Sequence, residues 1–459
     1  MSADTESGGG GGPAGVVRGN PRVLVLVAAN TFSNFGSAVA MLAFSYVSYV
    51  ITGSLTATVA NMAVSALPAL ILIRPAARLT LRFDLRWLCA VLALAKMVLF
   101  LGVGIFIASG YISFWLLFVT SLINGIIGAF TFPPWNNFLR QIAPPGRVAD
   151  LDSVIMSASA FAGIVGVMCG GLMLNAWGVA SLFYVNALSY ALYAAPFLLF
   201  PAVRAVASGG GRASMRAAAR VIRDEEALRR FVILALAVQL VAWPLLNLLP
   251  DIATDIGSNP LYFSLLLSAI YAGMALVAPI LALREKKYSH WQIAMIALII
   301  LMMATIIAGA SPVIDENSRL ILLMVVFVPL GIALNMTSVL SSAAVQSGAP
   351  DEHEASVLAV YSAAITVITP VGALIVAGIA DLTDVWVAVV VEGLGIGVLL
   401  VFLATPAMRR HFDHALHGRH HVIHRHAQHH AVARTLPGDM EPVRRGQTDP
   451  VISGGPQGA

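Results

Sequence analysis

The run Gly163-Ile-Val-Gly-Val-Met-Cys-Gly-Gly171 lies inside a long apolar segment that follows a polar turn beginning at Pro144. A counterpart occurs further along the chain, where Pro350 leads into an apolar segment that carries Gly372. One offset, a little under half the chain length, aligns Pro144 with Pro350 and Gly166 with Gly372. The repeat predicts a chain built from two halves of like design.

The composition is that of a membrane protein. Hydrophobic residues make up 58% of the chain, charged residues only 11%, and the mean hydropathy is +0.85, whereas soluble proteins carry about a quarter of their residues as charged side chains. Cys89 and Cys169 both fall in apolar segments, so we interpret them as core residues. Parallel halves are a recurring plan of membrane transporters.

A helix needs about 20 apolar residues to cross a bilayer. On that criterion the sequence predicts an all-α integral membrane protein with about twelve transmembrane helices in two six-helix bundles. The predicted spans are Arg22–Val50, Thr56–Arg74, Trp87–Ser109, Ser113–Phe132, Asp152–Leu174, Gly178–Phe200, Phe231–Leu249, Pro260–Leu283, Trp291–Ala310, Leu320–Gln346, Ser356–Ala380 and Val385–Thr405.

Basic residues alternate between the connections of these spans. They precede the first span and follow each even-numbered one, whereas the opposite connections carry only Arg319. By the positive-inside rule we expect a multi-pass protein of the inner (plasma) membrane with both termini cytoplasmic. The net charge of +4 therefore reflects topology, and we expect no nucleic-acid partner.

Five segments are predicted. Residues 1–21 form a disordered cytoplasmic N-terminus, 22–200 and 231–405 the two bundles, 201–230 a cytoplasmic linker, and 406–459 a His-rich disordered cytoplasmic tail. Within the linker, apolar and charged residues alternate at helical spacing over Met215–Arg230, which predicts an amphipathic surface helix.

Polar side chains recur every three or four residues along the first and fourth predicted helices of each half. Four polar faces around a central path suit a solute conduit, although such groups can also simply hydrogen-bond neighbouring helices. The candidate substrate-binding residues are Asn30, Asn34, Phe35, Asn124, Trp135, Gln239, Trp243, Asn247 and Asn335. Because these side chains are uncharged and partly aromatic, they favour a small amphiphilic organic ligand.

From about Val23 to Thr405 the chain resembles the major facilitator superfamily, and within it the bacterial exporters of siderophores, macrolides and metal ions. The features that carry the resemblance are Ser33–Gly36, Pro133, the Gly163–Gly171 run and Pro350–Glu352. The glycine run is similar to the antiporter motif of the family's fifth helix, where glycines let helices approach closely. The resemblance implies alternating access by rocking of one bundle against the other. It assigns gating or packing roles to Gly163, Gly166, Gly170, Gly171, Arg82, Asp84 and Gly372.

The chain also departs from the family pattern. Val167 replaces the proline of the antiporter motif, and Ala77 and Leu81 replace a glycine and an aspartate of the loop motif. These are motifs associated with coupling and gating. The candidate coupling residues are therefore two acids elsewhere in the chain, Glu392 within the last span and Asp251 near the end of the seventh.

The tail contains a run of histidines whose spacing would align several on one helical face. Neutral imidazole binds zinc, nickel and copper, so these residues are a candidate metal-capture segment. The members in question are His411, His414, His417, His421 and His424. The tail could equally be a pH-sensitive cationic segment or plain low-complexity sequence.

The sequence thus predicts a monomeric secondary transporter in the lipid bilayer, and not an enzyme, that exports small amphiphilic organic compounds such as a drug, a siderophore or a metabolite. The proton is the candidate coupling ion, and no cofactor is expected. Drug efflux of the multidrug-resistance kind would fit. Two alternatives stay open: a nickel, cobalt or zinc exporter assisted by the tail, and a membrane sensor or scaffold that does not transport.

Overall fold

The computed structural model describes residues 20–144, 147–205, 212–257, 259–282, 289–350 and 353–406. All of them belong to one compact unit of the chain. Within this described part the regular structure is helical, with a single isolated β-bridge between Asp84 and Arg204. Among the described residues, eleven helices are long and apolar enough to cross a membrane, and the bent pair Leu55–Ile71 and Arg74–Arg82 makes up to twelve. The predicted all-α membrane fold is confirmed.

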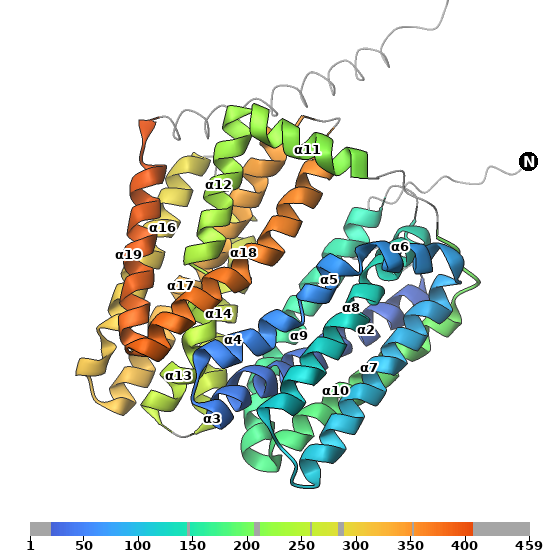
Figure 1. The fold of residues 1–459 in the computed structure, drawn as a ribbon, viewed down its shortest axis with the longest axis horizontal. Helices are drawn as coiled ribbons and strands as arrows, with labels where there is room; N and C mark the ends of the chain where they lie inside the picture. The colour runs from blue at the N-terminus through green and yellow to red at the C-terminus, as the bar shows by residue number, and fades with distance from the viewer. Residues whose placement is uncertain are drawn as a thin grey trace, which may run out of the picture. The chain divides into compact units, whose positions relative to one another are not determined.

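The helices divide between two bundles joined by α11 (Figure 1). The first bundle contains α2 (Pro21–Leu42), the π-helix η1 (Ala43–Val47), α3 (Ser48–Thr52), α4 (Leu55–Val64), α5 (Leu67–Ile71), α6 (Ile73–Arg82), α7 (Leu85–Ala108), α8 (Phe114–Ile142), α9 (Val148–Trp177), α10 (Val179–Ala194) and η2 (Ala195–Leu199). After α11 (Arg212–Asp224), the second contains α12 (Glu226–Val241), α13 (Leu245–Ile256), α14 (Pro260–Ala275), α15 (Val277–Ala282), α16 (His290–Gly309), η3 (Ser311–Val313), α17 (Glu316–Gly348), α18 (Glu354–Leu382) and α19 (Val385–Leu403).

The sequence repeat is also a repeat of packing. A β-carbon added at Gly166 on α9 would lie 2.7 Å from the carbonyl oxygen of Phe35 on α2. One added at Gly372 on α18 would overlap the carbonyl oxygen of Leu240 on α12. Since α2 and α12 are the first helices of their bundles, the fifth membrane-crossing segment of each half touches the first in the same way.

The second predicted span is a broken helix. The chain bends by 63° after Ile71, between Leu55–Ile71 and Arg74–Arg82, and an earlier break at Ser65 and Ala66 separates α4 from α5, where Pro68 lies near the helix start. Gly125 on α8 makes room for this break, because a β-carbon there would overlap the carbonyl oxygen of Ser65. Proline cannot donate a backbone hydrogen bond, which explains an interruption at this place.

The predicted amphipathic helix was placed too far along the chain. The surface helix α11 ends at Asp224, and Glu226 to Arg230 form the first turns of α12, so the linker helix and the seventh span meet at Glu225. The seventh span is itself broken between Val241 and Leu245, where Pro244 precedes α13.

Side-chain caps fix other helix starts. Asp315 accepts a hydrogen bond from the Ser318 N–H at 3.1 Å, and this backbone contact holds the pKa of Asp315 below its ordinary value.

The two bundles meet through particular helices. The first bundle's α9 packs against α14, and α4 packs against α18 and α13 of the second. The ribbons of the bundles converge at α3, α4 and α13 and diverge towards α6 and α11 (Figure 1). The end at which the bundles converge is named the α3–α4 end, and the end at which they diverge is named the α11 end.

Candidate functional site

A cavity of about 350 Å³ lies between the two bundles. Its wall comes from α2 and α9 of the first bundle and from α14 and α17 of the second. The lining residues are Ala38, Met41, Ala160, Gly163, Ile164, Tyr271, Met274, Ala275 and Asn335. None of them is ionisable except Tyr271, so the cavity offers apolar surface with a few uncharged polar groups, which is the usual composition of a small-molecule site.

A second cavity of about 190 Å³ lies within the first bundle and is more polar. Its lining residues are Ser37, Ala40, Met41, Phe44, Met62, Ser65, Phe100, Ser121, Asn124, Asn186 and Tyr190. The amide oxygen of Asn124 is buried and has no hydrogen-bond partner among the described residues. A buried acceptor without a partner is costly, so this cavity is suited to a ligand group or a water molecule that donates a hydrogen bond.

The π-helix η1 shapes the polar cavity. The backbone carbonyl of Phe44 accepts a hydrogen bond from the Asn61 side-chain amide at 3.1 Å, and Asn61 in turn accepts from Ser121 at 2.7 Å. Single-turn π-helices inside α-helices are frequent at functional sites. Met41 immediately precedes the last α-helical residue before η1 and lines both cavities. A flexible thioether therefore forms the wall that the two cavities share.

Of the nine candidate substrate-binding residues, Asn124 and Asn335 line these cavities. Asn335 also donates to the carbonyl oxygen of Met274 at 2.9 Å, which ties α17 to α14. Asn30 and Asn34 instead contact Ser159 on α9 at 3.3 and 3.1 Å. Those two amides hold helices of one bundle together, which is the alternative that the sequence left open.

The remaining candidates occupy other positions. Phe35 stacks on Phe32 with ring centroids 5.7 Å apart, and Gln239 donates to Ser338 at 3.3 Å. Trp135 packs against two rings of the α10 and η2 segment, Tyr193 and Phe197. Each of these contacts joins residues of the same bundle.

Trp243 and Asn247 flank the break before α13. The indole nitrogen of Trp243 is buried without a hydrogen-bond partner in the described part of the chain. Asn247 is half-buried on the first turn of α13. Neither residue lines the two cavities described above.

The glycine run performs three different tasks. A β-carbon at Gly170 would lie 2.6 Å from Leu42 on α2, so Gly166 and Gly170 both permit close packing of α9 on α2. One at Gly171 would lie 2.5 Å from the β-carbon of Ser264 on α14, so Gly171 permits contact between the bundles. Gly163 has no neighbour of this kind within 4 Å and borders the inter-bundle cavity, so it makes no close helix contact of the kind made by Gly166 and Gly170, and its predicted gating or packing role stays a prediction.

Asp84 stabilises a loop of its own bundle. It accepts from the Val203 backbone N–H at 3.1 Å and pairs with Arg86 at 2.9 Å, while Arg86 also reaches the carbonyl oxygen of Phe200 at 3.1 Å. These contacts tie the start of α7 to the segment that follows η2. Arg82 is exposed at the end of α6.

Glu392 on α19 is 2% exposed. One carboxylate oxygen accepts the backbone N–H of Leu245 at 3.0 Å, which caps α13 just after the helix break. The other oxygen is buried and has no partner among the described residues. A carboxyl group at such a position is a functional candidate because intramembrane charge is costly.

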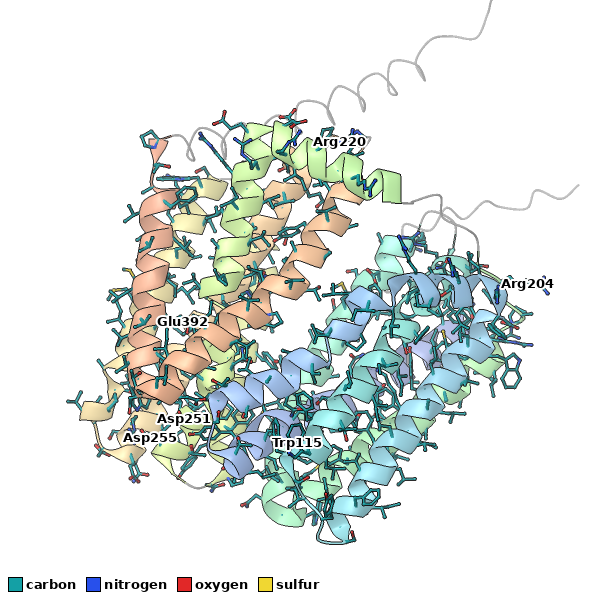
Figure 2. All side chains as sticks on the ribbon, in the orientation of Figure 1. Trp115, Arg204, Arg220, Asp251, Asp255 and Glu392 are labelled. Carbon is teal, nitrogen blue, oxygen red and sulfur yellow. The ribbon has the colours of Figure 1, made fainter. Side chains whose placement is uncertain are left out.

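Asp251, by contrast, links the bundles. Its carboxylate accepts a hydrogen bond of 2.5 Å from the hydroxyl of Tyr49 on α3. One turn further along α13, Asp255 pairs with Arg319 at 2.9 Å inside the second bundle. Figure 2 shows both aspartates near the α3–α4 end and Glu392 further from it.

The histidines of the predicted metal-capture segment, His411, His414, His417, His421 and His424, lie outside the described residues. Within residues that are described, no group of three or more His, Cys, Asp or Glu side chains is arranged to hold a metal ion.

Sequence reasoning did not identify Tyr190 and Tyr271 as site residues. Tyr271 donates to the sulfur of Met41 at 3.9 Å across the bundle interface, and Tyr190 shares a hydrogen bond of 3.1 Å with Ser37. The available signal was a tyrosine in the interior of a largely apolar span, which is typical of many packing positions too.

Comparison with known families settles the class of protein. The family model described as Major Facilitator Superfamily matches residues 25–373 and, in an overlapping second match, residues 231–425. The chain belongs to this superfamily. A comparison with curated protein sequences found no match.

Solved structures of other superfamily-type transporters share the fold. The nucleoside transporter NupG is 14% identical with a TM-score of 0.66, and the match covers 84% of this chain and 98% of that one. A bacterial homolog of the human lysosomal transporter Spinster, in an inward-facing and unoccupied conformation, is 13% identical with a TM-score of 0.60 over 86% and 96% of the two chains. The peptide transporter POT is 11% identical with a TM-score of 0.64 over 89% and 100%. At these identities the likeness establishes the fold and not the substrate.

Proposed function

We propose that this superfamily member is a secondary exporter of a small, uncharged or weakly charged amphiphilic organic compound. The observation that carries the proposal is the inter-bundle cavity, to which each bundle contributes two helices and whose described lining residues include no carboxylate, histidine or basic side chain. A hydrated ion would require such ligands. An amphiphilic compound could place its apolar part against Met41, Ile164 and Met274.

The adjoining polar cavity supports the same class of substrate. Asn124 presents an acceptor without a partner in the described part of the chain, so a hydroxyl or amine group of the compound would satisfy it. Because Met41 alone belongs to both linings, one molecule could extend from the apolar cavity into the polar one.

Alternating access fits the way the bundles meet. The α11 end carries clustered basic residues, including Arg204 and Arg220 (Figure 2), and we assign it to the cytoplasm by the positive-inside rule. On that assignment both termini are cytoplasmic and the protein lies in the inner membrane with its α3–α4 end outward. The glycine run of α9, similar to an antiporter motif, supports export with the proton as coupling ion. Glu392 and Asp251 are the candidate residues for that coupling.

The proposal can be tested by filling the cavity. Gly163 borders it and has open space around its α-carbon, so Gly163→Leu should occupy the cavity without disturbing helix packing. Gly102 on α7 has equally open surroundings but lies outside both cavities, which makes Gly102→Leu the matched control. Both changes replace glycine within a helix, where leucine has the higher helix propensity.

Growth of an efflux-deficient bacterial host would be measured across dyes, antibiotics, nickel, cobalt and zinc. We expect the wild type and Gly102→Leu to confer resistance to one or more organic compounds and Gly163→Leu to abolish it. Resistance that is unchanged by Gly163→Leu, or resistance to metals alone, would refute the proposal.

A further inference from the structure

A carboxylate of the second bundle caps a helix of the first. Asp381, at the end of α18, accepts hydrogen bonds from the backbone N–H groups of Leu55 and Thr56 at 2.8 and 3.0 Å. It also accepts one from the hydroxyl of Ser54 at 2.6 Å. Leu55 and Thr56 are the first two residues of α4, so the cap joins the second bundle to the first.

The first N–H groups of any helix lack partners within the helix, and its N-terminus attracts negative charge. In α4, the Ser54 side chain already accepts from Ala57 at 3.1 Å. Asp381 supplies the acceptors for the two N–H groups that Ser54 does not reach. The start of α4 is therefore fully hydrogen-bonded only while the bundles are in contact at this end.

The hydroxyl of Tyr49 makes a second hydrogen bond in which the first bundle donates and the second accepts. It lies on the first bundle and donates to Asp251 of the second at 2.5 Å. At the α3–α4 end, then, the first bundle provides donors and the second provides carboxylates, from α13 in one case and from α18 in the other.

Two neighbouring aspartates have a different role. Asp384 accepts from the Trp386 N–H at 2.7 Å and caps α19, and Asp255 pairs with Arg319 and with the Trp386 indole. Both sets of contacts lie within the second bundle. Acidic residues close together at one end of the molecule thus divide into those that join the bundles and those that do not.

We propose that Asp381 is a latch that holds the α3–α4 end closed, and that its contacts with α4 break and reform during the transport cycle. That these contacts break during a transport cycle rests on the proposed function, whereas the closure of the α3–α4 end rests on the hydrogen bonds alone. Asp381 acts by positioning one bundle against the other and has no contact with either cavity.

The exposure of Asp381 to solvent determines how strongly its hydrogen bonds favour the closed conformation. Asp381 is exposed, so water screens its charge and the latch is a modest bias rather than a permanent bond. Asparagine would keep one acceptor oxygen but lose the charge, and charge-assisted hydrogen bonds are roughly twice as strong as neutral ones. For Asp381→Asn we expect the ratio of open to closed molecules at this end to rise roughly fivefold.

The experiment measures the distance between bundles without any substrate. Spin labels would be attached at Tyr111→Cys, in the connection between α7 and α8, and at Val313→Cys, in η3, in a background carrying Cys89→Ala and Cys169→Ala. Tyr111 and Val313 are 59% and 90% exposed and belong to different bundles, so labels there should not disturb packing. Double electron–electron resonance on the purified protein in lipid nanodiscs gives the distribution of label separations.

Asp384→Asn is the matched control, because it neutralises an aspartate three residues away that caps a helix of its own bundle. We expect the parent and Asp384→Asn to share a predominantly short separation, and Asp381→Asn to gain a longer one. Equal distributions for all three proteins, an equal gain in Asp384→Asn, or a predominantly long separation in the parent would each overturn the latch. A transport assay that fails while Asp381→Asn still opens this end would count against the proposed function and leave the latch standing.

Discussion

Glu392 combines burial in the membrane-spanning region with a defined structural task. One oxygen caps α13 through the Leu245 N–H, and the other has no partner among the described residues. A carboxyl group of this kind can bind and release a proton while its first oxygen continues to hold the helix. Its position next to the helix break would let that change act on α13, which also carries Asp251.

Glu392→Gln separates these two tasks. Glutamine keeps an acceptor for the Leu245 N–H, so we expect the free energy of unfolding to change by less than about 1 kcal/mol. It cannot take up a proton, so accumulation driven by a pH gradient should be lost while exchange of substrate across the membrane persists. Both would be measured with the purified protein in liposomes.

The comparison variant is Glu392→Ala, which leaves the Leu245 N–H buried and unpaired and should cost about 1–3 kcal/mol of stability. Undiminished gradient-driven accumulation by Glu392→Gln would exclude this carboxyl group as the coupling residue.

Asn124 supplies a buried side-chain acceptor of the polar cavity that has no partner among the described residues. Asn124→Ala should raise the Kd of a transported compound roughly two- to tenfold, the range of one net hydrogen bond. The measurement is ligand binding by tryptophan fluorescence or calorimetry. Asn137→Ala is the control, because that amide lies on the same helix and donates to the Pro133 carbonyl of its own helix at 3.0 Å. An equal loss in both variants would count against a binding role for Asn124.

At this scale the sequence could identify polar positions but not their partners. Asn30 and Asn124 belong to similar stripes, yet the first bonds Ser159 on α9 and the second faces a cavity. Helical periodicity fixes the face of a residue, whereas its partner depends on which helix lies opposite, and that is decided by the packing of distant segments.

Among the elements, α9 combines contacts within its bundle, a contact between the bundles and a part of the cavity wall on one helix. Gly166 and Gly170 face α2, Gly171 faces α14, and Gly163 faces the cavity. Because a helix turns by about 100° per residue, a run of closely spaced glycines can serve several surfaces at once.

Two alanine substitutions on α9 should therefore have opposite effects. Gly166→Ala places a methyl group 2.7 Å from the Phe35 carbonyl oxygen, and the forced shift should cost about 1–3 kcal/mol. Gly163→Ala meets open space and should gain up to about 1 kcal/mol from helix propensity. Thermal unfolding in one detergent would compare them. Equal Tm values, or a lower Tm for Gly163→Ala, would contradict this assignment of faces.

The sequence predicted the number of spans but not their interruptions. The predicted spans Thr56–Arg74 and Phe231–Leu249 consist mainly of apolar residues, so each was predicted as one uninterrupted helix. Pro68 and Pro244 are visible in the sequence, but prolines also occur inside α8 and α18 without ending them. Whether a proline bends or breaks a membrane helix depends on which neighbour satisfies the freed backbone groups, as Glu392 does for Leu245.

For the whole molecule, the two-bundle architecture was predictable because the two halves of the sequence share a repeated pattern of residues. The common offset that joins Gly166 to Gly372 also joins Gly125 to Gly331, and each glycine of the second pair permits a close helix contact as well. The conformation was not predictable, since the hydrogen bonds of Tyr49, Asp251 and Asp381 join segments that lie far apart in the sequence. Their hydrogen bonds arise only when the bundles meet at the α3–α4 end.

Transport by the purified protein is the first property to establish. An organic compound selected by the growth screen would be loaded into liposomes containing the wild type, Gly102→Leu or Gly163→Leu, and its movement down an imposed concentration gradient would be followed. We predict comparable rates for the wild type and Gly102→Leu and less than about a tenth of that rate for Gly163→Leu, which corresponds to a loss of at least about 1.4 kcal/mol. Equal rates in all three proteins would show that the inter-bundle cavity is not the substrate path, and movement in none of them would mean that this chain does not transport the compound.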